Sequence, residues 1–357
     1  MKDVAIVIPN NIWFCPFVES YKIVLNRLKV DYDIISWNRD GRVEEGIQYN
    51  CALKRISEFH IFMEYQKFIK FVKTEIRKNQ YKKIIVITSQ PGIFLSSFLI
   101  SKFKKKYIFD FRDLSIEQKL IFKYPFYRLL SNSFANVISS PGFLNHLPGG
   151  KIEYVQTHNF VKEDINKALQ VNNFRFQKPK DGTINILTIG GIRDYESNIQ
   201  IIKALANKSK FHLSFVGKGV AAEKLHDYVD KNSILNVDFE GYYPKSREKE
   251  YYENADIINI FYPRTKLHDS AISNRFYNSL AFRKPMIVTA DTTQGIYAST
   301  YNVGLALDDC VDLDNKLLTF INTIDAEIYE KNCVMLLEKF VKEYDEFEKI
   351  IERFVNN

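Results

Sequence analysis

The chain has 357 residues, with 46% hydrophobic and 26% charged side chains and a net charge of +7. This composition excludes a disordered protein. The length exceeds what one hydrophobic core usually organises, so we expect about two domains. Its four cysteines lie far apart without a C-x-x-C spacing, which argues against a disulfide framework and indicates a reducing compartment. No signal-peptide pattern is present, and no apolar stretch approaches the roughly 20 residues of a membrane-spanning helix, so we expect a cytoplasmic protein.

The first half of the chain alternates short β-like runs with helical patterns, which predicts a parallel sheet covered by helices on both faces. A polar stretch over residues 164–173 and a turn-rich stretch over 177–183 follow, so we place the first domain at residues 1–165 and a linker after it. The expected strands are residues 4–8, 32–36, 83–88, 107–110, 137–139 and 153–156.

This first half carries the excess positive charge. Residues 1–157 hold 24 Lys and Arg against 14 Asp and Glu, whereas residues 158–357 hold 26 against 29. Between residues 62 and 76 cations accompany an apolar face at helical spacing, and a lysine cluster follows at 102–106. Such a helix either lies on an anionic membrane surface or packs in the core with a solvated lysine face. No nucleic-acid-binding motif accompanies the charge, so we expect no nucleic-acid partner.

A second alternating series begins at residue 184 and predicts a second doubly wound domain over residues 180–335, followed by a long helix over about 326–355. Ligands of such domains bind at the carboxyl ends of the strands, so the residues after each strand are the first candidates for a site. The expected strands are residues 184–189, 212–216, 237–240, 257–260, 286–289 and 304–307.

Two glycine-containing loops follow neighbouring strands of this second domain. The first reads Gly190-Gly191-Ile192-Arg193, and the second reads Gly217-Lys218-Gly219. Glycine lets a phosphate approach the backbone, helix N–H groups favour an anion, and an adjacent cation can neutralise it. The two loops therefore predict either an anion pocket at one edge of the sheet or a pair of ordinary strand-to-helix turns.

A third segment, residues 270–288, opens a helix with polar residues and closes it with a Lys-Pro break before a buried strand. Ser273 or Asn274 can cap this helix, and Arg275 lies in its first turn. Backbone N–H groups at the helix start then remain for a phosphate.

The order of these segments resembles the donor-binding domain of GT-B glycosyltransferases. The most similar group is the family 4-like enzymes of bacterial surface polysaccharide synthesis, which make capsular and exopolysaccharides. The resemblance covers about residues 184–308, and the first half matches only loosely through residues 107–113 and 157–160. The matching segments are Gly-Gly-Ile-Arg, Phe-Val-Gly-Lys-Gly, Phe-Glu-Gly-Tyr (239–242), Tyr-Tyr-Glu-Asn-Ala-Asp (251–256) and residues 274–287.

The resemblance implies an α/β protein of the GT-B fold, in which two Rossmann-like, doubly wound parallel-sheet domains face a cleft. The first domain then binds the acceptor, the second binds a nucleotide-sugar donor, and the terminal helix, about 340–357, packs back on the first domain. Arg193 and Lys218 would neutralise the donor diphosphate, and Tyr242 would lie near the base. The implied donor-binding residues are Gly190, Gly191, Arg193, Lys218, Tyr242, His268, Ser270, Ser273, Asn274, Arg275 and Asn278.

The sequence departs from the family at one pair of positions. The family usually carries two glutamates eight positions apart, the first facing the donor sugar and the second the ribose. Ser270 and Asn278 occupy these positions here. Asn278 can hydrogen-bond a ribose hydroxyl, whereas Ser270 lacks the charge of a glutamate, for which Asp269 is a candidate substitute.

Polar residues also follow the strands of the first domain. Asp110, Arg112 and Asp113 are expected to face the cleft as catalytic residues, with a carboxylate as general base on an acceptor hydroxyl and Arg112 keeping it ionised. The alternative is a structural Arg–Asp pair that fixes the loop. Asn10, Asn11 and Trp13 follow the first strand and are the expected acceptor-binding residues, because an aromatic face suits a sugar ring.

The resulting hypothesis is a glycosyltransferase that moves a sugar from a nucleotide sugar to a glycan acceptor, with a lipid-linked oligosaccharide at the inner face of the cell membrane as the expected acceptor. We expect no bound metal and no cofactor besides the donor, because no metal-binding spacing occurs and this fold stabilises the departing diphosphate with cations and helix N-termini. Two alternatives remain at this point, a nucleotide-sugar epimerase and a non-catalytic partner subunit of another transferase.

Overall fold

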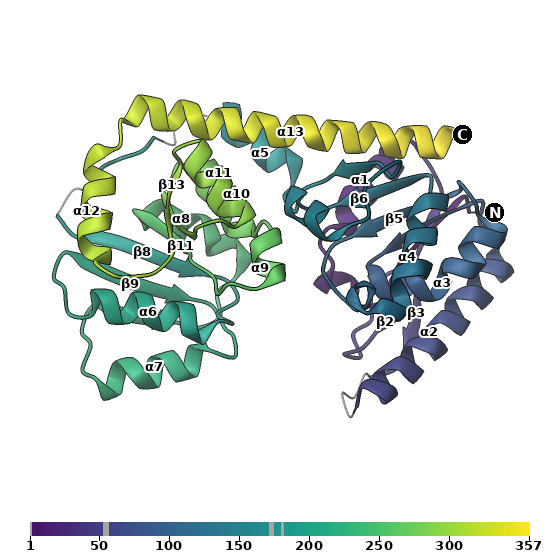
Figure 1. The fold of residues 1–357 in the computed structure, drawn as a ribbon, viewed down its shortest axis with the longest axis horizontal. Coiled ribbons are helices and arrows are strands. Elements are labelled where there is room, and N and C mark those ends of the chain that lie inside the picture. The colour runs from purple at the N-terminus through teal and green to yellow at the C-terminus, as the bar shows by residue number, and fades with distance from the viewer. Residues whose placement is uncertain (1, 53–56, 171–174, 180–181) are drawn as a thin grey trace. The chain divides into compact units, whose positions relative to one another are not determined.

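A computed structural model describes residues 2–52, 57–170, 175–179 and 182–357 of the chain. The chain divides into two compact units, one formed by residues 1–159 together with 342–357 and the other by residues 160–341 (Figure 1). Each unit contains one parallel sheet with helices packed on it, which confirms the predicted fold class. Part of the expected linker, residues 171–174 and 180–181, lies outside the described residues.

The sheet of the first unit has, in the described residues, seven parallel strands in the order β3-β2-β1-β4-β5-β6-β7. Strands β1 and β4 are runs of Val, Ile and Ala whose apolar residues are fully buried, as expected for a parallel sheet covered on both faces. The strands are β1 (Val4–Ile8), β2 (Tyr32–Asn38), β3 (Ile47–Asn50), β4 (Lys83–Ile87), β5 (Tyr107–Phe111), β6 (Ala135–Ile138) and β7 (Tyr154–Gln156). The helices are α1 (Val18–Arg27), α2 (Glu58–Asn79), α3 (Ser89–Lys102) and α4 (Leu120–Asn132), with short 3₁₀ segments at Ile12–Phe14, Ile116–Gln118 and Pro141–His146.

Helix α2 contains the basic amphipathic stretch, and its apolar face packs in the core. Phe68 and Val72 are fully buried, and Phe68 stacks on Trp37 of β2 with ring centroids 5.3 Å apart. Lys67 and Lys70 are exposed. Of the two interpretations of this stretch, the core helix with a solvated lysine face is therefore correct, and the membrane-facing one is wrong for residues 65–76. No helix in the described part of the chain is long and apolar enough to cross a membrane.

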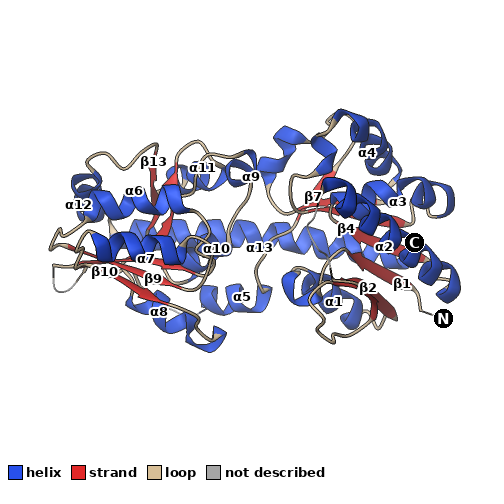
Figure 2. Cartoon of the chain, turned by 90° about the horizontal axis from the view of Figure 1, so that it is seen from below, coloured by secondary structure: helices blue, strands red, loops and turns tan. Residues whose placement is uncertain are grey.

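The sheet of the second unit has six described parallel strands in the order β10-β9-β8-β11-β12-β13. One core cluster packs α6, α7 and α12 on one face of the sheet, and a second packs α8, α10 and α13 on the other, so the unit has three layers (Figure 2). The strands are β8 (Ile184–Ile189), β9 (Phe211–Val216), β10 (Val237–Glu240), β11 (Ile257–Ile260), β12 (Met286–Thr289) and β13 (Gly304–Leu307). The helices are α5 (Lys162–Gln170), α6 (Tyr195–Leu205), α7 (Ala222–Lys231), α8 (Glu248–Asn254), α9 (Lys266–Ser270), α10 (Asn274–Ala281), α11 (Thr293–Thr300), α12 (Leu313–Thr323) and α13 (Ala326–Asn356), with a 3₁₀ segment at Lys245–Arg247.

Two helices occur where the chain passes from one unit to the other. Helix α5, which begins within the range expected for the first domain, packs with the second unit, where Ile165 is buried in the core. The last part of α13, residues 342–357, packs with the first unit. There Phe347 packs edge-on against Tyr21 of α1, with ring centroids 5.1 Å apart, and Glu348 pairs with Arg27.

Candidate functional site

The second unit has its topological switch point between β8 and β11. From β8 the chain continues outward through β9 and β10, and then returns to β11 on the other side of β8. A crevice at the carboxyl ends of two such strands is the usual ligand site of a doubly wound sheet. Gly190 follows β8 at this point, and Phe261 follows β11.

The two glycine loops lie side by side at this edge, as the sequence predicts. The Gly190 N–H donates to the Val216 carbonyl at 2.8 Å, and the Ile192 N–H donates to the Lys218 carbonyl at 3.1 Å. A Cβ at Gly217 would lie 2.0 Å from the Gly190 carbonyl oxygen, so only glycine permits this approach. The side chains of Arg193 and Lys218 are exposed. The two loops therefore present two cations beside closely packed backbone, an arrangement that suits a diphosphate.

Arg275, expected to contact phosphate, instead braces the backbone beneath the loops. Its side chain is buried, and its guanidinium donates to the carbonyls of Ile189, Gly191 at 3.0 Å and Asn259 at 3.3 Å. These carbonyls belong to the ends of β8 and β11 and to the first glycine loop. Arg275 thus fixes both sides of the switch point, and it acts on a ligand only through the loop that it holds.

The start of α10 lies at this switch point with its backbone donors uncapped by a side chain. Ser273 is the N-cap residue, but its hydroxyl and its N–H both donate to Gln294 Oε1, at 2.8 and 3.0 Å, and it makes no side-chain cap bond. Asn274 is exposed. No sequence pattern points to Gln294, because it lies in α11, 21 positions from Ser273. N–H groups at the helix start, with the positive end of the helix dipole, favour an anion here.

Polar side chains around α9 make hydrogen bonds and ion pairs within their own segment. His268 stacks on Tyr262 with ring centroids 5.0 Å apart, and its Nδ1 lies 3.1 Å from the Pro263 carbonyl oxygen. Ser270 is buried, and its hydroxyl donates to the Lys266 carbonyl at 2.8 Å. Asp269, the candidate substitute for the missing glutamate, pairs with Arg264 at 2.8 Å. The structure therefore shows Ser270 and Asp269 bonded within their own segment.

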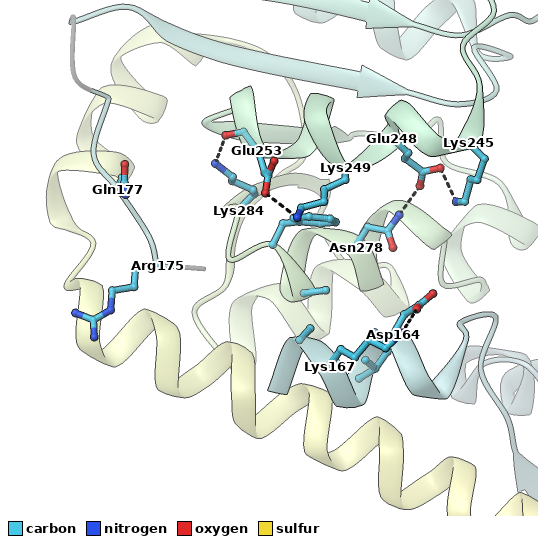
Figure 3. Close-up of a pocket in the computed structure, with 14 residues that line it drawn as sticks. Asp164, Lys167, Arg175, Gln177, Lys245, Glu248, Lys249, Glu253, Asn278 and Lys284 are labelled. Atoms are coloured by element: carbon cyan, nitrogen blue, oxygen red, sulfur yellow. Dashed lines mark hydrogen bonds and ion pairs between the residues drawn. The ribbon is translucent and has the colours of Figure 1, made fainter. Parts of the chain in front are cut away.

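Tyr242 and Asn278 lie in different surroundings. Tyr242 is exposed, and the Lys218 ammonium lies 6.0 Å from its ring centroid, so Tyr242 adjoins the second glycine loop. Asn278 donates to Glu248 Oε1 at 2.8 Å and lines an open pocket of about 800 Å³ formed by α5, α8 and α10 (Figure 3). Two cations of this pocket pair with carboxylates, Lys245 with Glu248 and Lys249 with Glu253.

The residues after β1 in the first unit form a hydrogen-bonded turn. Asn11 is fully buried, donates to Asn38 Oδ1 at 3.0 Å and to Glu44 Oε2 at 3.2 Å, and accepts from the Arg39 N–H. Asn11 therefore has a structural role, contrary to the expectation that it binds an acceptor. Asn10 caps the next N–H and stays partly exposed.

Trp13 is the aromatic residue of this turn that reaches the surface. Its side chain is 46% exposed, and its indole N–H donates to Asp40 at 2.9 Å. The Arg42 guanidinium lies 4.2 Å from the ring centroid, and the Phe14 ring lies beside it. Trp13 is thus held in place at the carboxyl edge of the sheet, where doubly wound domains bind their ligands.

Asp110 and Arg112 form the structural pair that was one of the two alternatives. Asp110 is fully buried, and one of its oxygens accepts from Arg112 at 2.6 Å and from the Tyr21 hydroxyl at 2.8 Å. Arg112 also donates to Asn159 Oδ1 at 2.9 Å. Burial, with the adjacent Asp110 charge, raises the pKa of Tyr21 well above its usual value. Because this carboxylate has no contact with solvent, the structure does not present Asp110 as a general base.

Asp113 remains the accessible carboxylate of the group. Its side chain is exposed. The protein packed around it raises the pKa of its carboxyl, an effect that Arg112 opposes and Glu117 reinforces. Thr88 follows β4, and its N–H donates to the Asp110 carbonyl at 2.8 Å. Its φ of +75° is a strained conformation for a β-branched residue, and such strain is typical of functional sites. His158, by contrast, is buried and bonded to Glu343 at 2.9 Å.

The described residues contain no cluster of three or more His, Cys, Asp or Glu side chains that could hold a metal ion. No protein-family model matches the sequence, and no curated protein matches it either.

Several solved structures share the fold over nearly the whole chain. The sucrose-phosphate synthase of Thermosynechococcus elongatus superposes with a TM-score of 0.71 at 13% identity over 99% of both chains. WaaG, a glycosyltransferase involved in lipopolysaccharide biosynthesis, gives 0.62 at 12% identity over 98% of this chain and 99% of its own. The UDP-GlcNAc 2-epimerase of Neisseria meningitidis, bound to UDP-GlcNAc, gives 0.55 at 10% identity over 96% of this chain and all of its own. The two parallel sheets and these likenesses together show that the chain has the GT-B fold.

Proposed function

We propose that this protein is a glycosyltransferase that uses a nucleotide-diphosphate sugar as donor. The observation that carries the proposal is the pair of glycine loops at the switch point of the second unit, with Arg193 and Lys218 exposed on them and Arg275 bracing them from below. Among the solved proteins of this fold, WaaG is named as a glycosyltransferase, another is named as a sucrose-phosphate synthase, and a third holds UDP-GlcNAc.

The proposed chemistry needs groups that stabilise the departing nucleoside diphosphate. Arg193 and Lys218 supply positive charge there, and the uncapped N–H groups of α10 supply fixed dipoles. The acceptor hydroxyl attacks the anomeric carbon, the bond from this carbon to the diphosphate breaks, and Asp113 takes the hydroxyl proton. In this proposal neither a metal nor a further cofactor takes part.

The proposed acceptor is a glycan carried on a lipid at the inner face of the cell membrane, in the synthesis of a bacterial surface polysaccharide. The basic first unit, with 24 cations against 14 carboxylates in residues 1–157, supports an anionic surface as partner. The likeness to WaaG, named for lipopolysaccharide biosynthesis, supports a surface glycan.

A second candidate function is that of a non-catalytic partner of another transferase. It is favoured by the bonds that Ser270 and Asn278 make to Lys266 and Glu248, at the positions where the resembled family carries glutamates. Such a protein should bind nucleotide sugars weakly and copurify with another chain. An epimerase of the same fold, as in the Neisseria structure, should convert a nucleotide sugar without any acceptor.

The deciding experiment measures binding of UDP, GDP, dTDP, CMP and their common sugars to the wild type and to Lys218→Ala by ligand-observed NMR and calorimetry. We expect one nucleotide to bind and Lys218→Ala to weaken it at least about tenfold, since a charge-assisted hydrogen bond contributes roughly 1.5–3 kcal/mol. Lys210→Ala is the matched control, because Lys210 is an exposed cation just before the other end of the same strand, β9. Equal losses in both variants, or binding of no nucleotide, contradict the proposed donor site.

The role of Asp113 predicts a pH dependence of the transfer reaction. A base must be deprotonated, and the surrounding protein raises the pKa of this carboxyl, so kcat/KM should fall as the pH drops through a value above 3.8, the ordinary value for this group. Asp113→Asn should lower kcat about 10²–10⁴-fold without changing the Kd of the nucleotide. An unchanged pH profile in this variant would show that another group takes the proton.

A further inference from the structure

We infer that the first unit docks on an anionic lipid bilayer through the first turns of α2 and α4. Seven large apolar side chains of the described residues are exposed there, with Leu120 at 81% and Ile121 at 75% exposure. They are Phe59, Phe62 and Met63 on α2 and Leu120, Ile121, Tyr124 and Tyr127 on α4. We call this surface the α2–α4 patch. Water contact of this many large apolar groups is unfavourable, and such clusters mark interaction sites.

Contacts through α3 join the two helix starts into one surface. Phe94 of α3 packs edge-on against Phe62 on one side and Phe122 on the other, with ring centroids 5.6 and 5.9 Å apart. Lys119, just before α4, pairs with Glu58 at the start of α2 at 3.2 Å. The three helices lie together in the first unit (Figure 1). Phe62 of α2 and Phe122 of α4 thus pack against the same ring of α3, which connects the starts of the two helices.

The charge beside the patch identifies its occupant. Residues 118–152, which include α4, contain four Lys and Arg and no Asp or Glu. Lys123 and Arg128 of α4 are exposed, and the Arg128 guanidinium lies 6.0 Å from the Tyr124 ring centroid. A second copy of the chain would bring the same cations against each other, whereas an anionic bilayer complements them. Apolar side chains beside Tyr and basic residues are the composition of an interfacial membrane anchor.

The α2–α4 patch lies at the carboxyl edge of the first unit's sheet. Helices α3 and α4 begin after β4 and β5, so their first turns are at the carboxyl edge of the sheet, where Thr88 and Asp113 lie. A bilayer bound to the patch would bring this edge to the membrane surface. This part of the inference rests on the proposed function, in which Asp113 receives a lipid-linked acceptor.

Vesicle flotation tests the inference with the full-length chain. The wild type should bind vesicles of phosphatidylcholine with 30% phosphatidylglycerol more tightly than vesicles of phosphatidylcholine alone, and less tightly as salt rises. The Leu120→Glu/Ile121→Glu variant should lose at least about 30-fold in partitioning, because two large side chains no longer enter the bilayer and two negative charges are added. Glutamate in the first turn of α4 suits the helix dipole, so folding should be unaffected, and circular dichroism checks this.

The matched control is Leu235→Glu/Val311→Glu, which adds the same charge at two apolar positions of the second unit with 88% and 69% exposure. It should bind vesicles like the wild type. Equal binding by all three proteins, or no binding of the wild type to either vesicle, overturns the inference. Self-association of the wild type that only the patch variant abolishes would overturn it too, by assigning the patch to a second copy. Nucleotide binding is measured on the same samples. A wild type that binds a nucleotide but neither kind of vesicle refutes the docking surface alone, and a wild type that binds vesicles but no nucleotide refutes the donor site alone.

Discussion

The Arg275→Ala protein will bind nucleotide at least about 100-fold more weakly than the wild type, although the guanidinium that it loses is directed at backbone carbonyls. Arg275 donates to Ile189, Gly191 and Asn259. A buried acceptor left without its partner costs roughly 1–3 kcal/mol. Leaving three buried carbonyls unpaired therefore costs more free energy than rearranging the loop, and we expect the loop to move. Once the first glycine loop shifts, Arg193 is no longer held beside the second glycine loop and Lys218. Isothermal calorimetry with the nucleotide found in the donor screen measures the loss.

Two comparisons separate this positioning role from direct contact. Arg275→Lys should recover only a small part of the affinity, because one ammonium cannot span three carbonyls that a planar guanidinium reaches. The nucleotide affinity of Lys218→Ala should depend less on salt than that of the wild type, whereas Arg275→Ala should keep the wild-type salt dependence, since its exposed cations remain. Full affinity in Arg275→Ala, with hydrogen exchange of residues 190–193 unchanged, would contradict the bracing role.

Arg112→Met will lower the unfolding free energy of the first unit by about 3–5 kcal/mol, the usual cost of removing one partner from a buried ion pair. Asp110 is fully buried, and Arg112 supplies the cation that compensates its charge, while the Tyr21 hydroxyl donates to the same oxygen. Without Arg112 the carboxylate is buried next to a hydroxyl alone. Urea unfolding followed by tryptophan fluorescence reports on this unit, because Trp13 and Trp37, the only tryptophans of the sequence, both belong to it.

The double variant Asp110→Asn/Arg112→Met should regain most of this loss, because a neutral amide needs no counter-ion and still accepts from Tyr21. Lys119→Met is the surface control: its pair with Glu58 is exposed on both sides, so its loss should cost less than about 1 kcal/mol. If the double variant were as unstable as Arg112→Met, lost packing and not the uncompensated charge would be the cause.

Much of the fold follows from the sequence because parallel strands buried on both faces leave an unmistakable pattern. The apolar runs of β1, β4 and β8 are buried where the sequence predicts strands. The strand that the sequence did not predict, β3, lies at the edge of its sheet, and its residues are half-buried or exposed. Its Gln and Asn residues give no apolar run, and only pairing with β2 makes it a strand.

The place of the proposed donor site also follows from the sequence alone. Strands β8 and β9 are consecutive and parallel, so their carboxyl ends share one edge, and the glycines after them come together by necessity. A backbone φ of +130° and a Cβ that would strike Gly190 explain why position 217 holds glycine. The glycine pattern predicts this arrangement because the close approach of the two loops depends only on residues next to these two strands.

What only the tertiary structure decided is which polar side chains of these loops are accessible. Arg193 and Arg275 both follow a turn in the sequence, yet the first is exposed and the second reaches carbonyls 84 and 86 positions away. Asn11 and Asp110 likewise find their partners 27 and 89 positions along the chain. A side chain turns inward where a distant strand offers an unpaired polar group. Leaving that group buried without a hydrogen bond costs more free energy than the side chain loses when it leaves water.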